Sequence, residues 1–103
     1  MDPFAIRFSQ NSISYRFRDG GTIDDLAEDL RAGRVRSEDV PPIRLVEREG
    51  HLYTLDNRRL EAFRRAGVEV PWRMANPEEI EVEGWKFTTT NAGTSVRVRG
   101  QPE

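Results

Sequence analysis

The segment Leu52–Gly67 constrains the fold more than any other part of the chain, because it combines a strand, a tight turn and a helix. Residues 52–55 alternate in polarity and are rich in strand formers, and Asp56 and Asn57 have the chemistry of a turn. Apolar residues then recur at helical spacing, at Leu60, Phe63 and Ala66. Gly67 is a typical residue to end a helix. The segment therefore predicts strand, turn and helix in direct succession.

Two arginines stand at the start of this helix, where the backbone disfavours them. The first turn of a helix exposes free N–H groups and a partial positive charge, so that a cation there costs about 0.3–1 kcal/mol. Arg58 and Arg59 occupy these positions nevertheless. Together with the open N–H groups they predict a pocket for an anion, most naturally a phosphate. The alternative is that Asp56 and nearby glutamates pair with both arginines and that the site is empty.

The other segments predict an α+β fold, a small mixed sheet with two or three helices. We expect strands at 4–8, 43–47, 51–55 and 68–74, the second and third forming a hairpin and the last lying at an edge because it contains Pro71. Thr22 opens a helix with capping-box character. The order is β-α-β-β-α-β within a single domain, 1–103, whose core spans about 4–75.

A short C-terminal extension follows this core. Asn76, Pro77 and the next glutamates predict a helix start, and 84–100 is interpreted as a hairpin or as an extension of that helix. Residues 9–14 are expected to form a connector, although Arg16 and Arg18, which follow, make this loop a second candidate for ligand contact. Trp72 and Met74 are expected in the core.

Composition excludes several chemistries. The chain has no cysteine and a single histidine, His51, which excludes disulfides, a thiol nucleophile and a His-cluster metal site. All but one of the 16 basic residues are arginine, and residues 51–75 are net positive on a chain of net charge -2. This suits a small anionic ligand or a confined nucleic-acid contact better than a long duplex. No apolar run could span a membrane and the start resembles no signal peptide, so we expect a cytoplasmic protein or one delivered as part of a larger effector.

Four segments resemble the ParB/sulfiredoxin-like superfamily over about 4–75: Thr22–Leu30, Pro42–Leu45, Tyr53–Ala62 and Ala66–Pro71. The ParB N-terminal domain has Gly-Glu-Arg-Arg-x-Arg-Ala where this chain has Asp56–Ala62, and there the turn and helix start hold nucleotide phosphates. Asp56 replaces the family glycine. Asn57 replaces the catalytic cysteine of sulfiredoxins, which excludes sulfinic acid reduction. The later ParB nucleotide motif and helix-turn-helix are missing, which leaves a similarity to minimal ParB-like nuclease-type domains and bacterial toxin modules.

The resemblance implies a domain that binds a nucleotide or nucleic-acid phosphate, and a nuclease or NTPase effector with an immunity protein as a candidate partner. Arg58 and Arg59 would bind phosphate, Asn57 would donate to it and Arg16 would approach from the first loop. Asp56 and Arg59 are the catalytic candidates, with Asp56 orienting water or holding a divalent ion such as Mg²⁺. Phosphoryl or ADP-ribosyl transfer is a weaker option.

A non-catalytic protein- or anion-binding module is the alternative from another class. Other residues would then carry the function, namely Trp72, Trp85, Phe87, Arg97 and Arg99.

Overall fold

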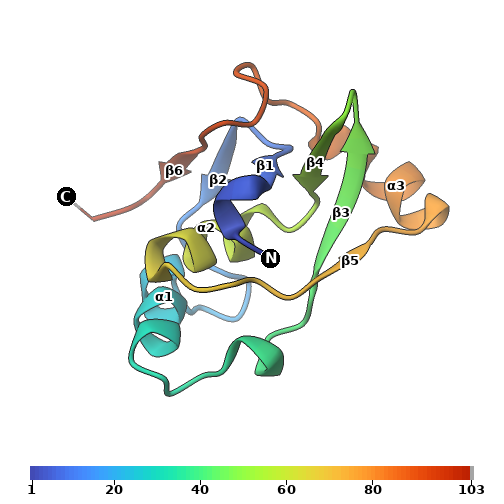
Figure 1. The fold of residues 1–103 in the computed structure, drawn as a ribbon. Helices are drawn as coiled ribbons and strands as arrows, with labels where there is room; N and C mark the ends of the chain where they lie inside the picture. Colours follow the sequence, from blue (N-terminus) through green and yellow to red (C-terminus); the bar gives the residue numbers. More distant parts are fainter. Residues whose placement is uncertain (103) are drawn as a thin grey trace.

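The computed structural model describes residues 1–102 and has the expected α+β fold (Figure 1). The strands are β1 (Arg7–Phe8), β2 (Ser12–Ser14), β3 (Ile43–Arg48), β4 (His51–Thr54), β5 (Trp72–Met74) and β6 (Arg97–Arg99). The α-helices are α1 (Ile23–Arg31), α2 (Asn57–Ala66) and α3 (Pro77–Glu83). Short 3-10 helices are η1 (Pro3–Ala5), η2 (Ser37–Asp39) and η3 (Gly84–Lys86).

The main sheet has four strands in the order β1-β4-β3-β5. The predicted hairpin is present, with β3 and β4 antiparallel, whereas β1 pairs with β4 and β5 pairs with β3 in parallel. A second sheet joins β2 and β6 in parallel, so that segments from the two ends of the sequence lie side by side (Figure 1). Between residues 1 and 102 no helix is long and apolar enough to cross a membrane.

The helix ends follow local chemistry, with one exception. Thr22 and Asp25 form a capping box at the start of α1, and Asn76 caps α3 in the same way. Helix α2 ends at Gly67, whose φ of 70° is left-handed. Its N-cap residue, Asp56, makes no side-chain cap hydrogen bond. The N-terminus of α2 is therefore unusual in its capping as well as in its charge.

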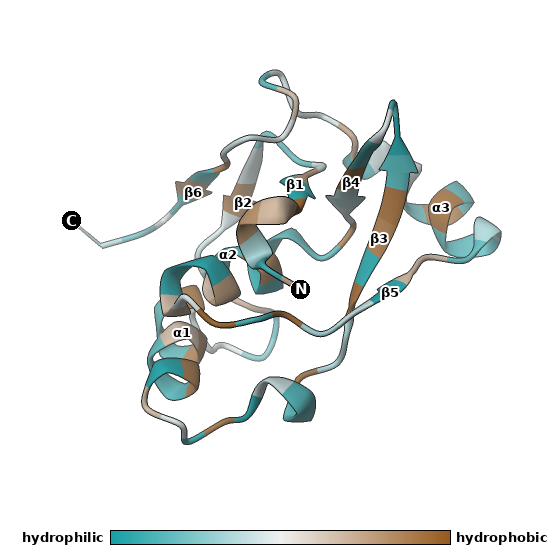
Figure 2. Cartoon of the chain, viewed as in Figure 1, coloured by the Kyte–Doolittle hydropathy of each residue, from teal (hydrophilic) through white to brown (hydrophobic). Residues whose placement is uncertain are grey.

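The core lies between the main sheet and helices α1 and α2, which pack against each other. Figure 2 shows apolar residues along the middle of β3, while the β3–β4 tip is polar. The fully buried large side chains include Phe8, Ile43, Leu45, Leu60 and Phe63. A second cluster joins Ile13, Tyr15, Ile23 and Ala62 beneath the β2–β6 sheet.

Several local predictions were wrong. Residues 9–14 contain strand β2, because Ile13 reaches the second core cluster. Of the two interpretations of 84–100, the hairpin is wrong, whereas η3 continues directly from α3, as the helix extension expected. Strand β6 crosses to β2, where Val98 packs on the same cluster. The first strand, β1, begins at Arg7 and not at residue 4, because residues 3–5 form the 3-10 helix η1, which Asp2 caps.

Trp72 and Met74 were expected in the core but are 45% and 48% exposed. Strand β5 is the edge of the main sheet, as predicted, and all three of its residues are exposed. The hydrophobic side chains on this strand therefore remain accessible to solvent.

Gly93 brings the C-terminal segment against β1. Its carbonyl accepts a hydrogen bond from the N–H of Phe8 (2.9 Å), and its φ is 70°. A Cβ at this position would overlap the backbone of Phe8. Only glycine satisfies both the left-handed backbone and the close approach.

We expect Gly93→Ala to lower the free energy of unfolding more than Gly67→Ala does. The two glycines have the same φ of 70°, but a Cβ at Gly67 meets open space. Both variants incur left-handed strain of about 1–2 kcal/mol, and Gly93→Ala adds about 1–3 kcal/mol of steric overlap. Urea denaturation measures both, and equal losses would show that the contact with Phe8 relaxes freely.

Candidate functional site

A cavity of about 580 Å³ opens at the N-terminus of α2, at the place that the sequence indicated. Its charged lining residues are Arg18, Asp56, Arg58, Arg59, Glu83, Lys86 and Arg99. Basic side chains thus outnumber acidic ones around it. The uncharged lining includes Ser14, Phe17, Asn57 and Trp85. The cavity combines hydrogen-bonding groups, positive charge and aromatic surface.

Three of the lining arginines have no ionic partner. Within residues 1–102, Arg18, Arg58 and Arg99 form no ion pair. Arg58 donates from Nη1 to the backbone carbonyl of Arg16 (3.0 Å), and its guanidinium lies 5.8 Å from the ring centre of Phe17. These arginines come from the loop after β2, from α2 and from β6. The site therefore retains positive charge that no side chain from residue 1 to 102 neutralises.

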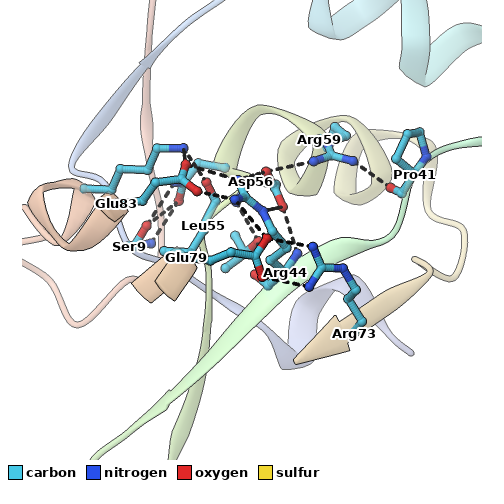
Figure 3. A network of polar contacts seen from close by, with 12 residues as sticks. Ser9, Pro41, Arg44, Leu55, Asp56, Arg59, Arg73, Glu79 and Glu83 are labelled. Atoms are coloured by element: carbon cyan, nitrogen blue, oxygen red, sulfur yellow. Dashed lines mark hydrogen bonds and ion pairs between the residues drawn. The ribbon is translucent and has the colours of Figure 1, made fainter. Parts of the chain in front are cut away.

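Arg59 behaves differently from Arg58. Its Nη2 lies 2.7 Å from Oδ1 of Asp56, and its Nη1 donates to the carbonyl of Pro41 (2.7 Å) (Figure 3). Of the two helix-start arginines, Arg59 is thus paired with the neighbouring carboxylate, as the empty-site alternative expected. Arg58 is not.

Arg44 organises the carboxylates beside the cavity. From β3, its Nη2 donates to Oδ1 of Asp56 (2.8 Å), and its Nε and backbone N–H donate to Oδ2 (3.0 and 2.8 Å). The same guanidinium pairs with Glu83 and lies 3.5 Å from Glu79 (Figure 3). It therefore connects the start of α2 to helix α3.

Helix α3 and η3 form one wall of the cavity and are held by polar contacts. Helix α3 has no buried residue. Arg73 pairs with Glu79 (2.7 Å), and Nζ of Lys86 contacts Glu83 (2.7 Å) and the carbonyl of Leu55 (2.9 Å). Ion pairs rather than apolar packing thus fix this wall.

The ion pairs shift the titration of the carboxylates. Burial alone would raise the pKa of Asp56, but hydrogen bonds from Arg44 and the charge of Arg59 hold this pKa below its ordinary value of 3.8. Hydrogen bonds from Arg73 lower the pKa of Glu79 to about 2. The hydrogen bond to Asp56 raises the pKa of Arg44. All three groups are ionised at neutral pH.

Two other predicted site residues differ in their surroundings: Asn57 is buried, and Arg16 is exposed outside the cavity lining. Asn57 is buried; its Oδ1 accepts from the N–H of Ser9 (2.9 Å), and its Nδ2 donates to the hydroxyl of Ser9 (3.0 Å) and to Gln10 (3.2 Å). Its amide therefore fixes the Ser9–Gln10 backbone at the cavity floor. Arg16 is exposed and lies outside the cavity lining, whereas Arg18 lies within it.

Sequence reasoning missed Arg44 and Lys86 as site residues. Arg44 carried no local signal, since an arginine within a strand is ordinary. Lys86 depends on the packing of η3, which was not predicted. The first loop, with Arg16 and Arg18, was a candidate for ligand contact, and of these two arginines only Arg18 belongs to the cavity lining.

A divalent cation does not fit the carboxylates of this cavity. Asp56 and Glu83 are paired with Arg44, Arg59 and Lys86, whose charges repel a metal ion. In the part of the chain that the structure describes, no group of three His, Cys, Asp or Glu residues could hold a metal. Asp56 and Glu83, as they are paired here, therefore do not form a Mg²⁺ site.

Comparison with known proteins assigns no family. No family model, no curated protein and no solved structure matches this chain.

We expect Asp56→Asn to lower the free energy of unfolding at pH 7 by about 3 kcal/mol, because it leaves Arg44 without its main partner. A carboxylate whose pKa is lowered by folding stabilises the protein above its unfolded pKa, and this contribution disappears as pH falls through the folded pKa. The difference between wild type and variant should therefore be constant above about pH 5 and shrink below the ordinary value of 3.8.

Urea denaturation at pH 7 and pH 3 measures this difference. Asp29→Asn is the matched control, because Asp29 pairs with Arg34 at an exposed position and should contribute at most about 1 kcal/mol. An equal loss in both variants would contradict the assigned role of Asp56.

Proposed function

We propose that this domain binds the phosphate of a nucleotide or nucleic acid in the cavity at the start of α2. The observation that carries the proposal is a set of three arginines around one cavity, Arg18, Arg58 and Arg99, which form no ion pair with the part of the chain that the structure describes. Guanidinium groups bind phosphate through charge-assisted hydrogen bonds in a planar fork. The positive end of α2 adds to the attraction.

The paired charges support the same proposal. Arg44 and Arg59 hold Asp56, and Lys86 holds Glu83, so the acidic residues of the lining are already neutralised. An anion that enters the cavity meets the remaining arginines without first displacing a carboxylate from them. We infer that the resemblance of this turn to that of ParB domains reflects a shared contact with phosphate.

Catalysis is a further part of the proposal. A nuclease or NTPase would use Arg59, and Arg58 beside it, to stabilise charge that develops on the phosphate. Asp56 would then act by positioning Arg59, because its two oxygens already accept hydrogen bonds from arginine. An effector role with an immunity protein would accompany such an activity.

Strand β5 favours a second candidate, a protein-binding module. Trp72 and Met74 are exposed on the edge strand of the main sheet. Exposed edges with hydrophobic side chains can pair with an extended segment of another chain.

Arg58→Ala should weaken binding of a fluorescently labelled nucleotide, measured by anisotropy, at least tenfold, which corresponds to about 1.4 kcal/mol. Arg7→Ala is the matched control, because Arg7 also donates to a single backbone carbonyl, that of Ala92, but lies outside the cavity lining. Binding that both variants retain equally would overturn the proposed site.

Incubation with labelled nucleotides, DNA and RNA, with and without Mg²⁺, tests catalysis. We expect turnover by the wild type and its loss in Arg59→Ala protein whose circular dichroism shows an intact fold. Nucleotide binding without turnover would leave a binding module, and equal turnover in Arg59→Ala would remove Arg59 from the mechanism.

A further inference from the structure

The outer face of the β2–β6 sheet carries hydroxyl and guanidinium groups and no acid. Ser12 pairs in register with Arg97, and Ser14 pairs with Arg99. Alternate residues of a strand point to the same side, and Ile13 and Val98 point to the core cluster. Ser12, Ser14, Arg97 and Arg99 therefore share the opposite, solvent-facing side of this sheet.

Arg16 continues this face beyond the end of β2. It is exposed, it follows Ser14 by two residues, and its N–H donates to the hydroxyl of Ser14 (3.3 Å). Its Nη1 donates to the carbonyl of Gly20 (3.4 Å). We call Ser12, Ser14, Arg16, Arg97 and Arg99 the arginine strip. No member forms an ion pair with any residue from 1 to 102.

The arginine strip is continuous with the cavity, because Ser14 and Arg99 line that cavity as well. At about 3.3 Å per residue, the strip from Ser12 to Arg16 extends about 13 Å along the strand. A single phosphate in the cavity would leave Arg97 and Arg16 without contact. A ligand with several linked phosphates would use both surfaces.

The aromatic side chains at the cavity indicate which kind of polyanion the site would bind. Trp85 lines the cavity and is 68% exposed, and Phe17 lines it beside Arg58. Proteins that bind single-stranded nucleic acid combine a basic groove for the backbone with aromatic rings on which bases stack. A single strand supplies both linked phosphates for the arginines and planar bases for the exposed rings. The short strip and the negative net charge disfavour a long duplex.

We infer that the ligand of this site is a single-stranded nucleic acid, whose backbone runs from the cavity along the arginine strip while a base stacks on Trp85 or Phe17. This inference rests on the proposed phosphate site and adds Arg97, Arg16 and the strip serines to it.

The experiment compares a labelled mononucleotide with labelled oligo(dT) and oligo(U) of about ten nucleotides, a length within the usual range of binding sites. Anisotropy titrations at several salt concentrations use wild type, Arg97→Gln and Arg31→Gln. Arg31 lies on α1 and is exposed, so Arg31→Gln matches the charge change away from the strip. The two oligonucleotides separate DNA from RNA, and a polyglutamate peptide of the same length tests for any polyanion.

We expect the oligonucleotides to bind more tightly than the mononucleotide. Arg97→Gln should weaken only oligonucleotide binding and reduce the slope of log affinity against log salt by about 0.7, the value for one phosphate contact on a single strand. Arg31→Gln should leave the slope unchanged.

Several outcomes would overturn the inference. If the mononucleotide binds but the oligonucleotides bind no more tightly, or if Arg97→Gln behaves as Arg31→Gln does, the strip has no role and the proposed phosphate site survives. If polyglutamate binds as tightly as the oligonucleotides, the nucleic-acid assignment fails. If neither nucleotide nor oligonucleotide binds, the proposed function fails with the inference.

Discussion

The contact between Arg44 and Asp56 is the interaction on which the rest of the site depends. Arg44 contributes two side-chain nitrogens and its backbone N–H to the carboxylate, and the side chain of Asp56 is only 8% exposed. The same guanidinium holds Glu83 of α3. Because α3 buries none of its residues, removal of this one cation would loosen both the start of α2 and the wall that α3 forms.

This arrangement explains the unusual start of α2. Asp56 occupies the N-cap position, but its carboxylate binds Arg44 and Arg59 in place of the helix N–H groups. A standard cap would have contributed about 1 kcal/mol to the helix. The carboxylate instead pairs with two arginines, whereas Arg58 next to them has no ion-pair partner among residues 1–102. The carboxylate of Asp56 can either cap the helix or pair with the arginines, and in this structure it pairs with the arginines.

Sequence periodicity predicted the elements whose signals are local, and missed those that depend on distant partners. The β3–β4 hairpin, the capped α1 and the α2 helix with Gly67 follow from neighbouring residues. Strand β2 does not, since its polar sequence becomes a strand only through β6. Similarly, the cavity could be placed at Arg58 and the first loop, but Lys86 and Arg99 reach it through tertiary packing alone.

The parallel pairing of β2 with β6 has a consequence for how the protein is made. Contacts between the two ends of a sequence form late, because the intervening chain must first be closed into a loop. During synthesis, the basic cavity stays unfinished until Arg99 has left the ribosome. The complete cavity therefore forms only after the chain that encloses it has been made, unlike the β3–β4 hairpin, whose two strands are neighbours in the sequence.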